Sequence, residues 1–141
     1  MTKTITTKAS DIKRNWRLFD VKNKILGRVG TEIAGILIGK SKPYFVHNLD
    51  CGDYVVVINS ASVSVTGKKM EQKIYRHYSG FPGGQKKKTL KQVLIEHPEK
   101  VIRQAVSGML PKNKLRDSML RRLYIFPDGN HPYKAKFSNF N

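Results

Sequence analysis

Residues 68–88 combine side chains that could bind nucleic acid, and they read KKMEQKIYRHYSGFPGGQKKK. No acidic residue occurs between Glu71 and Glu96, and aromatic rings and glycines are interspersed among the cations. Cations neutralise phosphates, flat rings provide surfaces on which bases or sugars pack, and glycines let a backbone approach a ligand closely. The segment therefore predicts a nucleic-acid-binding loop, with RNA favoured over DNA. The candidate residues are Lys68, Lys69, Lys73, Arg76, His77, Tyr78, Ser79, Gly80, Phe81, Gly83, Gly84, Lys86, Lys87 and Lys88.

The aromatic rings and the lysines of this loop each have a simpler interpretation. Tyr78 and Phe81 are the better candidates for stacking on bases, whereas Tyr75 could instead belong to the core. A run of Lys and Arg is often no more than a solvated face that keeps a protein soluble. That alternative weakens here because solubility needs mixed charges and a net charge of only about 2–8.

Two further basic groups lie towards the C-terminus. A helix expected to begin near Asn113 would offer free backbone amides to a phosphate and leave its arginines available to solvent or phosphate. The sequence after Asp128 contains no acid and predicts an arm that orders on its partner. The candidate residues in these groups are Lys112, Asn113, Arg116, Arg121, Arg122, His131, Lys134 and Lys136.

Nucleotide binding and hydrolysis fit the loop poorly. A Walker A loop requires G-x-x-x-x-G-K-[ST], but counting from Gly80 the second glycine position is occupied by Gln85. His77 and Ser79 lie close together in the sequence without the nucleophile elbow of a hydrolase. His77 is better explained as a hydrogen-bonding partner of phosphate or ribose.

A metal site would have to involve His47, Asp50, Cys51 and Asp53. Cys51 is the only cysteine in the sequence, and no paired ligand spacing occurs elsewhere. The two aspartates lie around Gly52 and are more simply explained as hydrogen-bond acceptors in a turn that enters a strand. We therefore expect no metal, no cofactor and no enzymatic activity.

The composition indicates an anionic partner. The 141 residues include 27 Lys and Arg against 10 Asp and Glu, for a formal net charge of +17, and 39% are hydrophobic, as in a folded domain. Self-repulsion at that charge opposes compaction, so a polyanion is expected to complete the stability of the fold. A membrane is the alternative partner, but the apolar runs are far too short to span one. The single cysteine, and an N-terminus without an apolar signal stretch, favour the cytoplasm.

Hydrophobic periodicity predicts the strands that position the loop. Alternating side chains predict a strand over 16–20, and a continuous β-branched run predicts a strand over 53–59 that is buried on both faces, as in a parallel sheet. Residues 60–66 alternate as a half-buried edge strand would, and 123–126 could form a last strand.

Helices are predicted between these strands. An apolar stripe over 29–37 indicates a helix that Gly39 could end as a left-handed cap. The segment Thr89-Leu-Lys-Gln92 has the spacing of a capping box, and Pro98 can occupy the first turn of the next helix. A third helix is expected near Asn113. Strands and helices in this order predict an α/β fold built in layers.

Five motifs carry a resemblance to a known family. They are DCGD at 50–53, VVVIN at 55–59, VTGKK at 65–69, YRHYSGFPGG at 75–84 and AVSGMLPKN at 105–113. In this order, and over 16–132, the sequence resembles the universal large-subunit ribosomal protein thirteen family in its bacterial form. One departure is Tyr133, which follows His131-Pro132 where bacterial members often carry a second histidine.

The resemblance implies a three-layer α/β/α single domain around a small, mainly parallel sheet. With the strands predicted above, this sheet would have four strands. It also implies a non-catalytic protein that is seated on large-subunit rRNA and takes part in early subunit assembly and translation. Lys68, Lys69, 75–80, Gly83, Gly84 and 108–113 align with the most characteristic runs of the family, as rRNA-facing residues or as residues that shape rRNA-facing loops. We expect an N-terminal arm over 1–15, the domain over 16–126 and an extended C-terminal arm over 127–141.

The partners expected from this resemblance are large-subunit rRNA and neighbouring large-subunit proteins in the cytoplasmic ribosome. No membrane, small-molecule substrate or self-association is expected. A regulatory RNA-binding protein that recognises an mRNA site is the alternative. An enzyme would need paired acids, a metal cluster or an activated nucleophile, and ten acidic residues scattered singly offer no obvious one.

Overall fold

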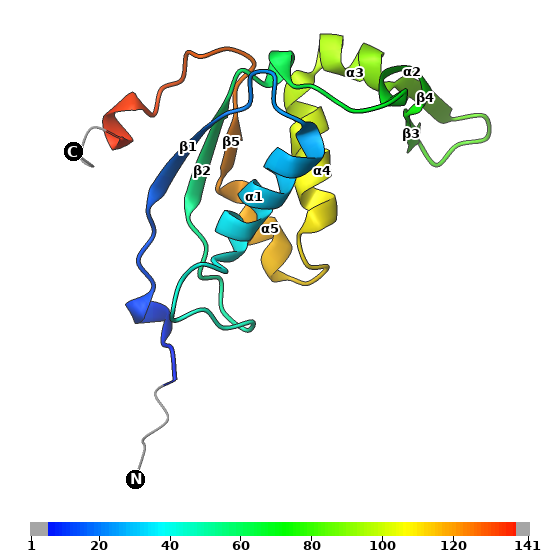
Figure 1. The fold of residues 1–141 in the computed structure, drawn as a ribbon. Helices are drawn as coiled ribbons and strands as arrows, with labels where there is room; N and C mark the ends of the chain where they lie inside the picture. The colour runs from blue at the N-terminus through cyan, green and yellow to red at the C-terminus, as the bar shows by residue number, and fades with distance from the viewer. Residues whose placement is uncertain (1–5, 138–141) are drawn as a thin grey trace.

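A computed structural model describes residues 6–137, and its centre is a parallel sheet in the order β1-β2-β5 (Figure 1). The strands are β1 Trp16–Asp20, β2 Tyr54–Ile58 and β5 Leu123–Ile125. The middle strand is the β-branched run of the sequence, and the side chains of Val55, Val56 and Val57 are fully buried. The predicted central parallel strand is therefore confirmed, because β2 pairs with a neighbour on each side and is covered on both faces.

Two helical connections join these strands. Helix α1 (Leu26–Ile38) leads from β1 to β2, and α3 (Leu90–Glu96), α4 (Pro98–Met109) and α5 (Leu115–Arg121) lie between β2 and β5. Because the strands are added in sequence order and parallel crossovers are right-handed, both connections pass over the same face of the sheet. Figure 1 shows the helices on one side of the sheet and the C-terminal segment on the other.

The α/β fold in layers is thus confirmed, but two details of the expected architecture differ. Within residues 6–137 the central sheet has three strands rather than four, and the layer opposite the helices is the C-terminal segment rather than a second set of helices. The predicted strand over 60–66 is wrong. Asn59 adopts a left-handed conformation (φ 61°), and the chain turns into the 3-10 helix Ser60–Ser62, after which Ser64 forms a single bridge to Ile25.

The core lies between the sheet and the helices. Ile33 and Leu37 of α1 and Val101 and Val106 of α4 are fully buried in one cluster with the inward side chains of the strands, such as Val55. The predicted apolar stripe of α1 therefore faces the core.

The expected helix ends are also found. Gly39 closes α1 in the left-handed region (φ 84°), where L side chains are disfavoured, and its N–H donates to the carbonyls of Gly35 and Ile36. Thr89 and Gln92 form the capping box of α3, and Pro98 begins α4.

Aromatic rings cover the opposite face of the sheet. Trp16 stacks on Tyr54 with the ring centroids 4.5 Å apart, and Tyr133 from the C-terminal segment stacks on Trp16 at 5.2 Å. Phe137 meets Trp16 edge-on at 6.4 Å, next to a 3-10 turn over Lys134–Lys136. The part of the predicted C-terminal arm within 127–137 is therefore packed on the sheet and not extended. Its last residues, 138–141, like 1–5 of the N-terminal arm, lie outside the described residues.

A buried ionic network ties the loop before β2 to the rest of the domain. Asp53 is 4% exposed, accepts a hydrogen bond from the N–H of Asn15 at 3.0 Å, and pairs with the Lys42 ammonium at 2.5 Å. Asp50 pairs with the guanidinium of Arg122. Both aspartates are structural hydrogen-bond acceptors, as expected for this turn.

Arg122 was expected to be available to solvent or phosphate, and this expectation is wrong. The residue is 6% exposed, and its Nη2 donates to Asp50 Oδ1 at 2.6 Å and to the carbonyl of Leu37 at 3.0 Å. Burial of a guanidinium requires a carboxylate partner, and Asp50 supplies it.

Candidate nucleic-acid interface

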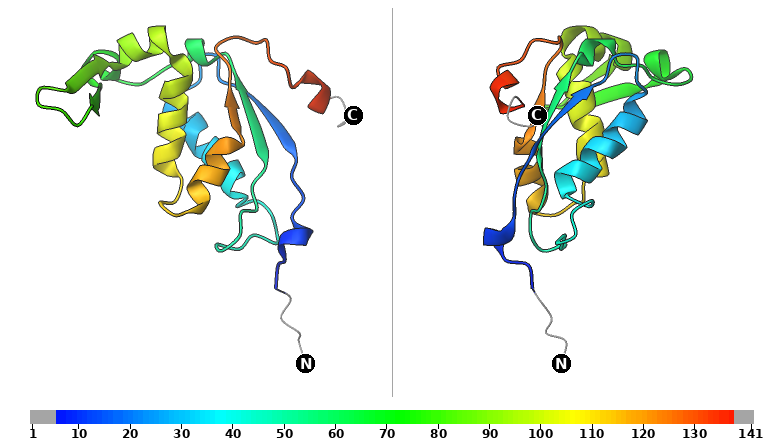
Figure 2. Two further views of the ribbon diagram at one scale, coloured as in Figure 1. Left: turned by 180° about the vertical axis from the view of Figure 1, so that it is seen from behind. Right: turned by 60° about the vertical axis from the view of Figure 1, so that its left-hand side comes forward.

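The segment predicted to be a basic loop is a short helix followed by a β-hairpin that projects from the domain (Figures 1 and 2). Helix α2 spans Lys69–Gln72, and the antiparallel strands are β3 Ile74–Tyr78 and β4 Gln85–Thr89. The backbone N–H of Leu90 donates to the carbonyl of Lys73, which fastens the base of the hairpin to the start of α3. A paired hairpin presents its side chains at fixed positions, which an unstructured loop would not.

Glycines determine the conformation of the hairpin tip. Gly80 and Gly83 adopt positive φ values of 88° and 71°, which other residues rarely tolerate. A Cβ atom on Gly84 would lie 2.0 Å from the Ser79 hydroxyl oxygen and 2.9 Å from the Phe81 carbonyl oxygen. These glycines therefore shape the turn, and the turn exposes backbone without side chains because only glycine fits its geometry.

Two aromatic rings near the tip are unusually exposed. Phe81 is 73% and Tyr78 61% exposed, and neither ring is within stacking range of another ring of the described residues. Exposed rings on a protruding hairpin are typical of a binding surface. Tyr75, in contrast, is half-buried and packs against the core cluster, and burial raises the pKa of its hydroxyl. The core alternative for Tyr75 is thus correct in part, and the Lys73 ammonium lies over its ring, 5.4 Å from the ring centroid.

Like charges face each other across the hairpin. Arg76 lies directly opposite Lys87. Cations at directly opposite positions destabilise a strand pair, because no carboxylate separates them. A bound polyanion would remove this repulsion, so the arrangement favours a phosphate-bearing ligand over a solvated face.

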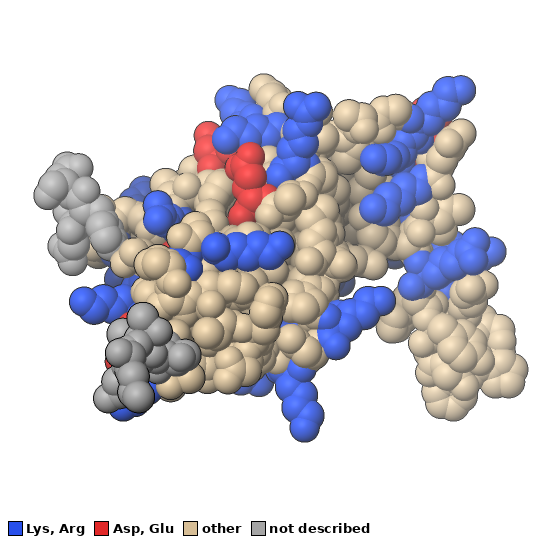
Figure 3. Space-filling model, turned by 60° about the horizontal axis from the view of Figure 1, so that its bottom comes forward, with Lys and Arg blue, Asp and Glu red and all other residues tan. Residues whose placement is uncertain are grey.

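One carboxylate is paired within this basic surface. The Lys88 ammonium donates a short hydrogen bond to Glu96 of α3, and this bond holds the pKa of the Glu96 carboxyl below its usual range. Lys88 is therefore partly neutralised in the free protein, unlike its neighbours Lys86 and Lys87. Figure 3 shows that Lys and Arg side chains surround the hollow between the hairpin and the body, while the visible acidic surface gathers mainly in a patch on the body.

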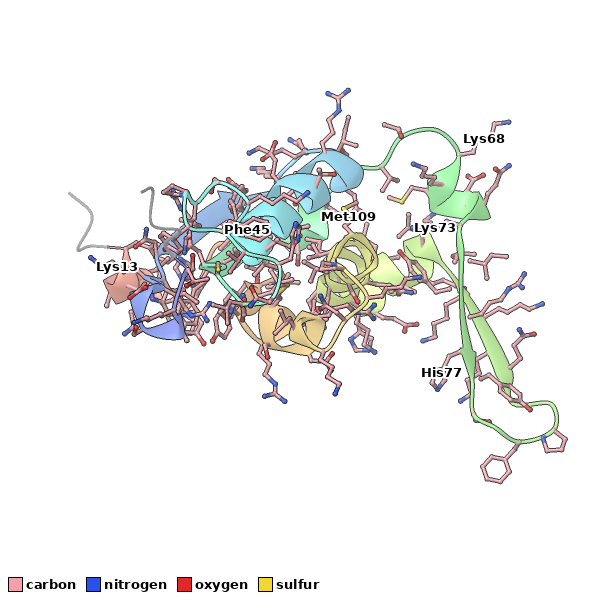
Figure 4. The ribbon with its side chains drawn as sticks, turned by 90° about the horizontal axis from the view of Figure 1, so that it is seen from below. Lys13, Phe45, Lys68, Lys73, His77 and Met109 are labelled. Atoms are coloured by element: carbon pink, nitrogen blue, oxygen red, sulfur yellow. The ribbon has the colours of Figure 1, made fainter. Side chains whose placement is uncertain are left out.

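The structure brings the residues of 68–88 together on one projection. Lys68 and Lys73 lie at the base of the hairpin, and the side chain of His77 lies on the side that faces the body (Figure 4). Sequence reasoning missed His97, Lys100 and Gln104, which face the hairpin across a groove. Lys100 and Gln104, four residues apart, lie on one side of α4, away from its apolar stripe, and His97 immediately precedes the helix. This helical periodicity is the signal that could have identified the two α4 residues.

The other candidate residues lie at separate places. Lys112 and Asn113 are exposed in the turn before α5, at the end of the domain away from the hairpin (Figure 1). Helix α5 begins at Leu115, and the Asn113 side chain accepts a hydrogen bond from the Leu115 N–H at 3.1 Å. The backbone amide of Leu115 is therefore already paired and is not free for a phosphate. Arg116 is half-buried and Arg121 is exposed.

The candidates of the C-terminal segment belong to the aromatic face of the sheet. Lys134 and Lys136 are exposed, and the Lys136 ammonium lies 6.0 Å from the Trp16 ring centroid. His131 is half-buried between Phe126 and Phe137, and its Nδ1 is buried without a hydrogen-bond partner. The predicted candidates therefore form three basic surfaces: the hairpin, the turn before α5 and the C-terminal segment.

Residues 6–137 contain neither a metal-binding cluster nor a membrane-spanning helix. No group of three His, Cys, Asp or Glu side chains lies close enough together to hold a metal ion. Over the same range no helix combines the length and the hydrophobicity needed to cross a membrane.

An α/β domain that projects a lysine-rich hairpin with open aromatic rings has the characteristics of an RNA-binding protein. Residues 14–132 match the model of the family described as ribosomal protein L13. One relative, named large ribosomal subunit protein uL13, is from Geobacter sp. strain M21 and is 46% identical over 95% of this chain and 94% of that protein. A second, with the same name, is from Aquifex aeolicus and is 48% identical over 95% of this chain and 93% of that protein. A third, with the same name, is from Prochlorococcus marinus subsp. pastoris and is 48% identical over 96% of this chain and 95% of that protein.

The chain belongs to the ribosomal protein L13 family. The resemblance found in the sequence motifs is therefore confirmed. This is a family of structural ribosomal proteins, which agrees with the expectation that the chain is not an enzyme.

Proposed function

We propose that this protein is a structural constituent of the large ribosomal subunit, where it binds large-subunit rRNA and supports early subunit assembly and translation in the cytoplasm. The observation that carries the proposal is the hairpin, which presents unpaired cations and exposed rings away from the body of the domain. Family membership supports it, because the relatives are named as large-subunit proteins.

The proposed mechanism is electrostatic and geometric. The α/β domain holds the hairpin, the turn before α5 and the C-terminal segment at fixed positions, and each surface would replace counterions on a different part of folded rRNA. A rigid body with separated basic surfaces can fix several RNA segments relative to one another. Neighbouring large-subunit proteins are the other partners that we propose.

The proposed rRNA contacts follow from the exposure of the candidate residues. Arg122 is excluded by its burial, and Gly80, Gly83 and Gly84 act by shaping the tip of the hairpin. The remaining contacts are Lys68, Lys69, Lys73, Arg76, His77, Tyr78, Ser79, Phe81, Lys86, Lys87, Lys88, Lys112, Asn113, Arg116, Arg121, His131, Lys134 and Lys136.

Sedimentation of a tagged copy through a sucrose gradient tests this proposal. We expect the protein to migrate with large subunits and their precursors and to stay with them through a high-salt wash, because contacts at separate surfaces must all break before it dissociates. A matched gradient with Lys86, Lys87 and Lys88 changed to Ala should show earlier loss during the wash. A protein that stays at the top of the gradient, and that crosslinks in cells to mRNA in preference to rRNA, would instead be a regulatory RNA-binding protein.

A further inference from the structure

A groove of about 430 Å³ separates the hairpin from helices α3 and α4. Tyr75, His77, Lys86 and Lys88 project into it from one face of the hairpin, which follows from their alternation along the paired strands. The opposite wall is made by Val93 and by polar side chains of the two helices. In Figure 4 the hairpin stands clear of the body on this side, so the groove is open to solvent.

The groove combines one aromatic surface with cations on two sides. The half-buried ring of Tyr75 and the side chain of Val93 form an apolar patch, and Lys86 and Lys100 come from the two opposite walls. A volume of about 430 Å³ is near the lower end of the range of about 300–1,000 Å³ that clefts for single small ligands occupy. A space of this size accepts one nucleotide and excludes a base-paired helix.

Charge is unevenly distributed along the groove. The Glu96 carboxylate, paired with Lys88, is an acceptor that would repel a phosphate. Neither Lys86 nor Lys100 forms an ion pair with a described carboxylate, although Lys100 lies near enough to Glu96 for its charge to help lower the pKa of that carboxyl. A phosphate is therefore favoured between those two ammonium groups, with an attached base turned towards the ring of Tyr75.

We propose that this groove holds a single unstacked nucleotide of the RNA, with its base against Tyr75 and its phosphate between Lys86 and Lys100. The inference rests on the proposed function and specifies how the RNA is bound. It divides the hairpin into two faces: the groove face takes one nucleotide pulled out of its stack, and the outer face, which carries Lys87, contacts phosphates of the neighbouring strand. Bases splayed out of a helix and stacked on aromatic side chains are a general mode of RNA recognition.

Photo-crosslinking to deproteinised large-subunit rRNA tests the groove directly. A diazirine-bearing lysine analogue at position 100 faces the groove, and the same analogue at position 87 faces outwards and serves as the matched control. We expect the analogue at position 100 to crosslink to a single nucleotide, which would be mapped as one reverse-transcription stop. We also expect that nucleotide to react more strongly with a 2′-hydroxyl acylating reagent in the complex than in the free rRNA. Crosslinks from position 87 alone would overturn the groove proposal and leave rRNA binding intact. Absence of rRNA binding would instead contradict the proposed function.

Affinity measurements on the same rRNA provide a second test. Loss of one base–ring stacking contact is expected to weaken binding by about five- to 150-fold in Tyr75→Leu, whereas Tyr75→Phe keeps the ring and should bind as the parent protein does. Lys100→Ala should weaken binding, and Lys91→Ala, an exposed change on α3 outside the groove, should not. Because Tyr75 also packs on the core, the affinity of Tyr75→Leu is interpreted only if this variant keeps the unfolding temperature of the parent protein. If it does not, the affinity of Lys100→Ala decides the test. Equal affinity in Lys100→Ala and Lys91→Ala would refute the proposal.

Discussion

Changing the three lysines of β4 to alanine should separate RNA binding from folding. Lys86 and Lys87 make no ion pair with another described residue, whereas Lys88 is paired with Glu96. Each phosphate that a cation neutralises contributes about 0.7–0.9 to the negative slope of log K against log salt. Loss of the two unpaired lysines alone is then expected to lower the magnitude of the slope by about 1.4–1.8. With Lys88 included, the upper limit is about 2.7, reached only if Lys88 leaves Glu96 on binding.

The assay is filter binding of labelled large-subunit rRNA over a series of KCl concentrations, with thermal unfolding of each free protein as the control. Unfolding of the triple variant should change little, because these side chains are exposed and removal of cross-strand like charges offsets the loss of one solvent-exposed ion pair. Glu96→Gln is the matched variant: it frees Lys88 and should steepen the slope by up to about 0.9. An unchanged slope in the triple variant, with the fold intact, would refute the assignment of the hairpin as an RNA-binding element.

Three other substitutions address the packing, the tip and the ion pair. Asp50→Ala leaves the buried guanidinium of Arg122 without this carboxylate partner and is expected to lower the free energy of unfolding by about 3–5 kcal/mol, measured by urea denaturation. A loss below about 1 kcal/mol would show that the pair is not buried in solution. Phe81→Ala should weaken rRNA binding by about 1–3 kcal/mol with no change in unfolding temperature, and equal affinity would rule out stacking by this ring. The Glu96 carboxyl should titrate below its usual pKa of 4.5 because it is paired with Lys88. This pairing therefore stabilises the native state above pH 4.5, and the stabilisation is lost as the pH falls through the lowered pKa. NMR titration should show the pKa of Glu96 return towards 4.5 in Lys88→Ala.

Local patterns in the sequence predicted the elements whose structure is determined locally. The stripe of α1, the glycine that ends it, the capping box at Thr89 and the proline that opens α4 each depend on residues within a few positions of one another. The run of valines in β2 was also sufficient, because continuous β-branched residues have few alternatives to a buried strand. The basic segment was identified as a candidate binding site from composition alone.

The features that sequence reasoning missed depend on contacts between distant residues. Alternation over 60–66 looked like a strand, but Ser60 is held by a backbone hydrogen bond to Phe126, and no neighbouring strand of the described chain is available to pair with it. Arg122 looked like a solvent-exposed cation until Asp50, 72 positions away, supplied its partner. The hairpin was interpreted as a loop because its second strand, β4, is rich in lysine, a residue that is uncommon in strands. The C-terminal segment folds back onto the sheet because Tyr133 stacks on Trp16, which lies near the other end of the chain.

The order of the strands has a consequence for biosynthesis. The N-terminal pair β1 and β2 can form once residue 58 has been made, but β5 and Arg122, the buried partner of Asp50, arrive only at residues 122–125. Until then the growing chain carries β2 with one edge unpaired, which is a template for association with other chains. A product ending at residue 121 should therefore aggregate instead of forming a smaller domain, and size-exclusion chromatography of that product would show a soluble monomer if this reasoning were wrong.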